Sequence, residues 1–187
     1  MKIADIIAAA QTESPRFRAW LSIMLHLEAE IDREGNILSE RPDDHGITFA
    51  GLNTQDDGIP ADPELISPGL IVSKYKSNYW TAAKAEALPY PIGEIVADIA
   101  LNEGGEFAGK ILQQSLNDLG EDLQTDGVIG QNTLQSAYRH DSRELAEEIL
   151  RRNDAHYRHI ADVNPAKLID LNGWLNRDGL LRSNYLA

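Results

Sequence analysis

The most consequential absence in this 187-residue sequence is cysteine, which does not occur at all. Disulfide bonds, thiolate nucleophiles and thiolate metal ligands are therefore excluded. The sequence also lacks any apolar run that approaches the length of a membrane span, so we expect no membrane insertion. Its start, MKIADIIAAAQTESPRF, has one lysine and an aspartate within a short apolar run. This is typical of a first helix rather than of a signal peptide, and we expect a soluble protein made in the cytoplasm.

Basic residues are scarce, with 17 Lys and Arg against 30 Asp and Glu, and the net charge is -13. A nucleic-acid-binding surface needs the opposite sign, so we expect no nucleic acid partner. The acidic residues are spread along the chain, as on an ordinary solvated surface. Neither a glycine-rich phosphate loop nor a Gly-x-Ser-x-Gly elbow is present, which removes two common kinds of catalytic site.

Two stretches match metal-binding patterns only in part. DLQTDGVIGQNT resembles a calcium loop at Asp122 and Asp126, but Thr133 stands where the closing glutamate is required. His156 and His159 lie near acidic residues without the spacing of a zinc protease motif. We interpret the first stretch as a tight turn and helix cap and the histidines as surface or interface residues. The sequence therefore predicts no metal and no cofactor.

The pattern of turn residues and apolar residues predicts a mainly α protein. Ser14-Pro15 and Ser67-Pro68 each pair an N-cap hydroxyl with a proline at the first helical position. Between them, residues 32–68 are dense in Gly, Asp, Asn and Pro, and predict loops with one small β-hairpin around REGNIL and GITFAGL. Helical patterns return after Ser67 and continue to the last helix, which we expect to start at Asn164-Pro165.

The helix expected from Pro15 to about Ile31 carries a carboxylate on its apolar side. With about 100° per residue, the apolar residues of this helix gather on one face. They are Phe17, Trp20, Leu21, Met24, Leu25, Leu27 and Ile31. Glu28 falls in the middle of that face, whereas Glu30 falls on the polar face.

Glu28 has two interpretations. It could be a buried structural glutamate that pairs with an arginine or with backbone donors. Alternatively, desolvation beside an aromatic residue such as Trp20 would raise its pKa, as the general acid of glycosidic-bond cleavage requires. The loop after the helix is rich in carboxylates, which either serve solubility and turn formation or include the second carboxylate of such a site. They are Asp32, Glu34, Glu40, Asp43 and Asp44.

A series of motifs in order resembles one known family. They are KYKSNYW, VADIALNEGG, ILQQSLN, DGVIGQNTL and GWLNR, after a glutamate that ends an apolar helix and the loop DDHGITFAGL. The resemblance is to the family 108 glycoside hydrolases, peptidoglycan N-acetylmuramidases with a C-terminal peptidoglycan-binding-like region, many of them in bacteriophages and prophages. It spans roughly Trp20 to Arg177. The N-terminal motif diverges, because EAEI stands in place of Glu-Gly-Gly-Tyr.

The resemblance implies a set of site residues. Glu28 takes the position of the catalytic acid, and Asp43 and Thr48 match the residues that position water or stabilise the transition state. Glu40 is a competing second carboxylate. The full set of expected substrate contacts is Glu40, Asp44, His45, Tyr79, Trp80 and Asn102. For Trp80 a place in the core is the alternative, and for Asn102 the alternative is fastening the end of its own helix.

The sequence thus predicts a mainly α, lysozyme-like fold with a small irregular or β-hairpin segment. We expect residues 1–92 to form a glycoside hydrolase lobe and residues 93–187 a helical peptidoglycan-binding-like lobe that is compact with the first. The expected activity is hydrolysis of the β-1,4 bond of the cell-wall glycan by a monomer whose partner is the peptidoglycan glycan strand. The alternatives are a peptidoglycan-binding or phage structural module without catalysis, and a cytoplasmic helical adaptor.

Overall fold

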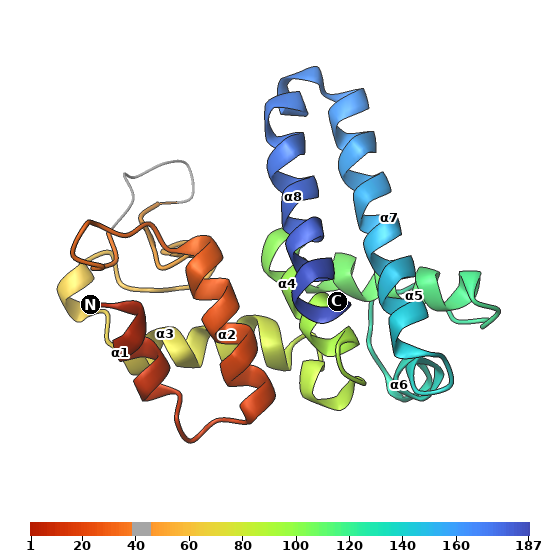
Figure 1. Cartoon of the computed structure of the whole chain (residues 1–187), viewed down its shortest axis with the longest axis horizontal. Helices are drawn as coiled ribbons and strands as arrows, with labels where there is room; N and C mark the ends of the chain where they lie inside the picture. The colour runs from red at the N-terminus through yellow and green to blue at the C-terminus, as the bar shows by residue number, and fades with distance from the viewer. Residues whose placement is uncertain (39–45) are drawn as a thin grey trace. The chain divides into compact units, whose positions relative to one another are not determined.

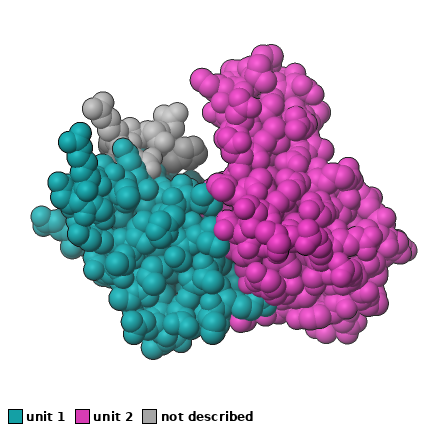
Figure 2. All heavy atoms as spheres, in the orientation of Figure 1, with its two compact units in different colours: residues 1–82 teal, residues 83–187 magenta. Residues whose placement is uncertain are grey.

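A computed structural model describes residues 1–38 and 46–187 (Figure 1). Helices dominate these residues, and the one two-stranded antiparallel sheet among them joins β1 to β2. The mainly α class with a small hairpin, predicted from the sequence, is confirmed. The chain divides into two compact units, residues 1–82 and 83–187, which Figure 2 distinguishes by colour. The predicted boundary between the two lobes, after residue 92, stays a prediction.

Unit 1 contains three α-helices, the hairpin and two shorter helical segments. They are α1 (Ile3–Ala9), α2 (Pro15–Glu28), β1 (Thr48–Phe49), β2 (Leu52–Asn53), the 3₁₀-helix η1 (Pro63–Leu65), α3 (Pro68–Tyr75) and the π-helix η2 (Lys76–Thr81). The two predicted helix starts are confirmed. The Ser14 hydroxyl accepts a hydrogen bond from the Phe17 amide at 3.2 Å, and the Ser67 hydroxyl accepts one from the Leu70 amide at 3.1 Å.

Helix α2 ends at Glu28, earlier than the sequence pattern predicts. Ala29 has φ -85° and ψ 122°, which is extended backbone. The chain then turns back on itself, and Ile31 forms an antiparallel bridge with Ile37. Because Ile31 has left the helix, its side chain is 50% exposed instead of extending the buried face, and Leu27 is also exposed. The bridge to Ile37 is a tertiary pairing that helical periodicity does not detect.

The hairpin forms within GITFAGLN rather than between that stretch and REGNIL. Thr48 pairs with Asn53 and Phe49 with Leu52. Because successive strand residues point to opposite faces, the buried Phe49 and Leu52 face the core while Thr48 and Asn53 face the other way. The two turn residues, Ala50 and Gly51, both have positive φ, as the tight turn of a two-residue hairpin requires.

An aromatic cluster forms the core of unit 1. The ring of Trp20 lies 5.4 Å from Trp80 and 5.9 Å from Tyr75, and Phe17 packs edge-on against Trp80 at 5.6 Å, all between centroids. All four side chains are at most 2% exposed. Such pairs contribute roughly 0.5–1.5 kcal/mol each beyond the apolar area that they bury. The cluster therefore fixes α2 against α3 and η2.

Unit 2 is built around one buried helix. Its elements are the 3₁₀-helix η3 (Ala85–Ala87), α4 (Ile92–Glu103), α5 (Gly105–Asp118), α6 (Gln131–Ala137), α7 (Ser142–Val163), the 3₁₀-helix η4 (Pro165–Lys167) and α8 (Leu168–Tyr185). Every residue from Ile92 to Ala100 is buried, so this part of α4 is enclosed on all sides, whereas its last turn reaches the surface. Helices α7 and α8 lie side by side as a helical hairpin (Figure 1).

Buried polar groups connect the helices of unit 2. The Arg177 guanidinium donates to both carboxylate oxygens of Asp98, at distances from 2.7 to 3.1 Å, and joins α8 to α4. The Asn153 amide donates to both oxygens of Asp178 at 3.0 and 3.1 Å, and joins α7 to α8. Trp174 stacks on Tyr157 with the ring centroids 5.0 Å apart. None of the helices in the described ranges is long and apolar enough to cross a membrane.

Candidate active site

Glu28 is the last residue of α2, and its side chain is partly buried against the hairpin turn. Gly51, with φ +77°, approaches it so closely that a Cβ atom there would lie 2.4 Å from the Glu28 Cβ. The same Cβ atom would lie 2.8 Å from the Tyr75 hydroxyl. Only glycine fits this space and this backbone conformation without strain. The turn therefore forms one wall around the glutamate.

The turn is held in place by α3. The buried Tyr75 hydroxyl donates a hydrogen bond to the Ala50 carbonyl at 2.8 Å. Ala50 has φ +54°, in the left-handed region that costs an L-residue roughly 1–2 kcal/mol. The bond from Tyr75 satisfies a buried carbonyl in that strained conformation. Helix α3 thus fixes the turn, and the turn fixes the space available to Glu28.

Tyr79, on the π-helix, lies in the electrostatic field of Glu28. Its ring packs beside Tyr75 with 5.9 Å between centroids, and its hydroxyl donates to the Asp57 carboxylate. Burial first, then the hydrogen bond to Asp57, and then the negative charges of Asp57 and Glu28 raise the pKa of Tyr79 above its usual value. The phenol is therefore neutral over the whole range in which enzymes work. It remains partly exposed.

Asp57 is a buried carboxylate, 4% exposed, that the sequence does not single out. Its Oδ2 accepts a hydrogen bond from the Asn53 backbone amide at 2.9 Å, and its Oδ1 accepts from the Asn78 side-chain amide at 3.3 Å as well as from Tyr79. Sequence inspection misses it because it lies in a loop where many aspartates have turn roles. The one available signal is its neighbour Gly58, and a turn glycine beside an aspartate is too common to point to a site.

The other predicted site residues fall into three groups. Thr48 lies on β1, partly exposed and cross-strand from Asn53, whose amide binds Asp57. Glu40, Asp43, Asp44 and His45 lie outside the described residues.

Trp80 and Asn102 form the third group, and both occupy positions that match the alternatives considered for them. Trp80 is 2% exposed within the aromatic core, with the Arg16 guanidinium 5.8 Å from the centre of its ring, so it has almost no free face for a sugar. Asn102 belongs to unit 2, where its side-chain amide donates to the Asp98 carbonyl one turn earlier at 2.8 Å. This bond fastens the end of α4. Within unit 1, Tyr79 lies in the electrostatic field of Glu28, and Thr48 is the strand partner of Asn53, which binds Asp57.

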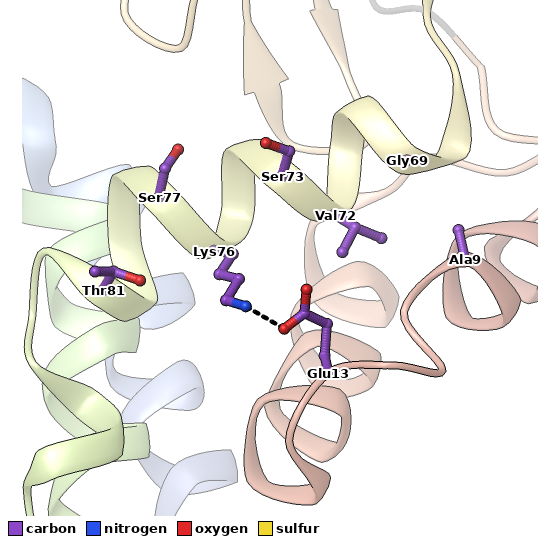
Figure 3. A pocket seen from close by; sticks show the side chains of 8 residues that line it. All are labelled: Ala9, Glu13, Gly69, Val72, Ser73, Lys76, Ser77 and Thr81. Carbon is purple, nitrogen blue, oxygen red and sulfur yellow. Dashed lines mark hydrogen bonds and ion pairs between the residues drawn. The ribbon is translucent and has the colours of Figure 1, made fainter.

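A separate groove of about 430 Å³ runs along α3 and η2 in the same unit (Figure 3). The Lys76 ammonium forms an ion pair across it with Glu13. The described residues that line it are Ala9, Glu13, Gly69, Val72, Ser73, Lys76, Ser77 and Thr81, none of which is a predicted site residue. In the described parts of the chain, no group of three or more His, Asp or Glu side chains could hold a metal ion.

Comparisons with known proteins place these observations in a family context. The chain resembles a solved structure of Brucella abortus SagA, with a TM-score of 0.69 and 22% sequence identity over 91% of this chain and 93% of that chain. The likeness is one of fold, and with the element order it confirms the predicted lysozyme-like class. A search of curated proteins finds no match.

Two family profiles match consecutive parts of the sequence. Residues 27–104 match Glycosyl hydrolase 108, and residues 107–179 match Predicted Peptidoglycan domain. The first match begins one residue before Glu28 and includes Gly51, Asp57 and Tyr79. Together the matches support a glycosidase related to peptidoglycan. One part of the chain is therefore similar to glycosyl hydrolase 108 and the next to a predicted peptidoglycan domain, and the resemblance indicated by its motifs is confirmed.

Proposed function

We propose that the protein is an N-acetylmuramidase, a lysozyme-type enzyme that hydrolyses the β-1,4 bond between N-acetylmuramic acid and N-acetylglucosamine. One observation carries this proposal: a partly buried glutamate ends α2 inside the segment that matches glycosyl hydrolase 108, with the Gly51 turn packed against it and Tyr79 within its electrostatic field. Peptidoglycan as the substrate is supported by the domain that follows this segment.

In the proposed reaction, Glu28 donates a proton to the leaving glycosidic oxygen. Asp43, with Thr48, positions the attacking water or stabilises the positive charge that develops on the sugar. Glu40 is the competing candidate for the second carboxylate. This chemistry uses side chains alone and requires no cofactor.

The altered motif after Glu28 is compatible with activity. Ala29 and Glu30 stand where the family resemblance expects glycines. Among the described residues, the only non-glycine residues with positive φ are Ala50 and Lys84, so neither Ala29 nor Glu30 is in a conformation that favours glycine. The backbone at Glu28 therefore adopts its course without the two glycines.

The second candidate function is a peptidoglycan-binding or phage structural module that has lost catalysis. It draws on the missing Glu-Gly-Gly-Tyr motif and on the net charge of -13, which is unfavourable for binding an anionic cell wall. The two functions differ in one measurable respect, since only the enzyme releases new reducing ends from purified sacculi.

We also propose that the protein acts on the cell wall after release from the cytoplasm, as a monomer. An endolysin of a bacteriophage or prophage would work in this way. Cell fractionation before and after lysis, together with light scattering of the purified protein, tests both parts.

The decisive experiment compares wild type with Glu28→Gln on purified peptidoglycan. We expect the substitution to lower kcat by roughly 10²–10⁴-fold, the usual contribution of a general acid. The matched control is Glu30→Gln, two residues along, where the side chain is exposed and activity should stay within twofold of wild type. Sacculus binding without release of reducing ends by wild type would favour the binding module. Full activity of Glu28→Gln would refute the assignment of the acid.

A further inference from the structure

The hydroxyl of Tyr79 has its hydrogen committed to a buried partner. Asp57 is an acceptor-only carboxylate, so in the hydrogen bond between them Tyr79 must be the donor. A phenol has a single hydrogen, and none remains for a second bond. The phenolic oxygen of this partly exposed side chain can therefore act only as an acceptor toward anything that binds next to it.

The orientation of Asp57 is set by two further donors from different elements. The Asn53 backbone amide, at the end of β2, holds Oδ2 at 2.9 Å, and the Asn78 side-chain amide, from the π-helix, reaches Oδ1 at 3.3 Å. Asn78 is itself oriented, because the Ser77 hydroxyl donates to its amide oxygen at 2.8 Å and leaves the nitrogen turned toward Asp57. Each oxygen of the carboxylate thus has a donor other than Tyr79, and these two donors fix its orientation.

The electrostatic surroundings of Tyr79 fit the same picture. Burial, the bond to Asp57 and the charges of Asp57, Glu28 and Asp56 together raise the pKa of Tyr79. The phenol therefore stays protonated and remains the donor in its bond to Asp57. The carboxylates of Asp57 and Asp56 beside Tyr79 also mean that this corner of unit 1 favours donor groups over acceptors in a ligand.

We propose that Asp57 is a positioning residue that fixes the Tyr79 phenol as a hydrogen-bond acceptor for a donor group of the glycan strand, a hydroxyl or an acetamido N–H, bound beside Glu28. The proposal rests on the proposed function for the identity of the ligand. It assigns to Asp57 a role in substrate recognition that operates through Tyr79, because at 4% exposure its own carboxylate cannot reach a glycan.

The competing account gives Asp57 a structural role only. It would close the turn from Asn53 to Asp57, and Tyr79 would be a bystander. The two accounts differ in the expected substrate affinity, since loss of a turn bond lowers thermal stability without changing the KM of the folded enzyme.

The first test replaces Tyr79 by phenylalanine, which keeps the ring and removes the oxygen. We expect KM for solubilised glycan strands to rise about 3- to 10-fold, the usual effect of losing one hydrogen bond, while kcat changes less than KM. The control is Tyr138→Phe in unit 2, where the side chain is 63% exposed and no kinetic change is expected. An unchanged KM for Tyr79→Phe overturns the proposal.

The second test is a double-mutant cycle with Asp57→Asn. An amide at position 57 can donate to the phenolic oxygen, so we expect it to occupy the acceptor site and to raise KM about as much as Tyr79→Phe does. In the Tyr79→Phe background the same substitution should leave KM unchanged. Equal effects of Asp57→Asn in both backgrounds, or a lower Tm with no change in KM, would support the structural account and overturn ours.

A spectroscopic readout monitors the bond itself. Alkaline titration of tyrosine absorbance in wild type should show the ionisation of Tyr79 delayed beyond the usual pH range of a tyrosine, because its pKa is raised. Asp57→Asn should move that ionisation to lower pH, and Tyr79→Phe should remove it. If the titration curves of wild type and Asp57→Asn coincide, the bond does not set the state of the phenol.

Binding of chitotetraose separates this proposal from the proposed function. If wild type binds this oligosaccharide but hydrolyses no glycan, the muramidase assignment fails while the Kd values of Tyr79→Phe and Asp57→Asn still test the acceptor. If wild type is active and both variants keep wild-type Kd and KM, the function stands and the acceptor role fails. If wild type binds neither chitotetraose nor sacculi, both proposals fail.

Discussion

Each of the two compact units buries carboxylates, but the hydrogen-bond donors that surround them differ between the units. In unit 1, Asp57 is satisfied by three uncharged donors, one of which is the partly exposed Tyr79 in the electrostatic field of Glu28. In unit 2, Asp98 is satisfied by the Arg177 guanidinium, and Asp178 by the Asn153 amide, with both pairs fixed between helices. The first network ends at a partly exposed tyrosine, and the second connects only buried or nearly buried groups.

The difference shows that burial of a charged group is by itself a poor sign of function. Both units satisfy buried carboxyl groups with hydrogen bonds, but unit 2 uses the bonds to join α4, α7 and α8. In unit 1 the corresponding bonds orient the phenol of a partly exposed tyrosine. A candidate site is therefore recognised by the accessible group at the end of a network, a distinction that substitutions in each unit can test.

Arg177→Ala should have the largest effect, and it should be on stability alone. Asp98 would be left as an unpaired charge at 1% exposure, so we expect a loss of about 3–5 kcal/mol in the free energy of unfolding. Urea denaturation measures this. Arg151→Ala, which removes a guanidinium with a 62% exposed side chain, is the matched control and should cost less than about 1 kcal/mol. A similar small loss for both variants would remove the contrast between the units.

Gly51→Ala should affect both stability and activity, because the turn touches Glu28. An alanine at φ +77° carries a strain of roughly 1–2 kcal/mol, and its Cβ would overlap the Glu28 side chain. We expect kcat to fall at least about tenfold as the carboxyl is displaced. Gly69→Ala in the first turn of α3 is the control, since no atom lies within 4 Å of its added Cβ. A wild-type kcat in Gly51→Ala would show that the turn does not control the position of the catalytic carboxyl.

Asp178→Asn should change how stability depends on pH. Burial, together with a hydrogen bond and charge from Asp154 and the charge of Asp98, raises the pKa of Asp178 to about 8, despite the bonds from Asn153. The folded protein then retains a proton that the unfolded chain releases above about pH 4. This contribution to stability is complete below about pH 4 and is lost as the pH rises to about 8.

An asparagine at position 178 has no proton to lose, so the variant should lose less stability between pH 5 and 8 than wild type does. The expected difference in slope is at most about 1.4 kcal/mol per pH unit, the value for one linked proton. Thermal melts across this range, with the exposed Asp162→Asn as control, measure it. Parallel profiles for Asp178→Asn and wild type would show that Asp178 is ionised in the folded protein.

Ala29→Gly should have the smallest effect, although it restores part of the expected motif. Ala29 has φ -85° and ψ 122°, which any L-residue adopts, so glycine brings no relief of strain. It should instead cost about 0.4–1 kcal/mol through the entropy of the unfolded chain. Activity assays and thermal melts together test this, and a large gain in kcat would mean that the altered motif does limit catalysis.

Local patterns in the sequence predicted the parts of the fold that depend on local interactions. Ser14-Pro15 and Ser67-Pro68 begin helices because a cap and a proline act within one turn. The end of α2 and the place of the hairpin were not predicted, since the Ile31–Ile37 bridge is a tertiary pairing. Periodicity brought Glu28 to attention because the helix around it is regular.

The neighbours of Glu28 were harder to predict because they come from separate stretches of the chain. Gly51 matched a motif, but its contact with Glu28 depends on how the hairpin folds onto α2. Asp57 resembles every other loop aspartate until its donors from β2 and the π-helix are known. The roles of Asp43 and Thr48 stay predictions.

Because Lys76–Thr81 is a π-helix, the directions of its side chains depend on the number of residues in this segment. In this wider turn, which is closed by i→i+5 bonds, Tyr79 reaches Asp57 while Trp80 enters the aromatic core. Removing one residue here would narrow the turn to i→i+4 bonds and change the direction of the side chains within it by up to about 100°, the rotation per residue of an α-helix. Relatives that conserve this corner should therefore tolerate substitutions within the segment far better than a single insertion or deletion.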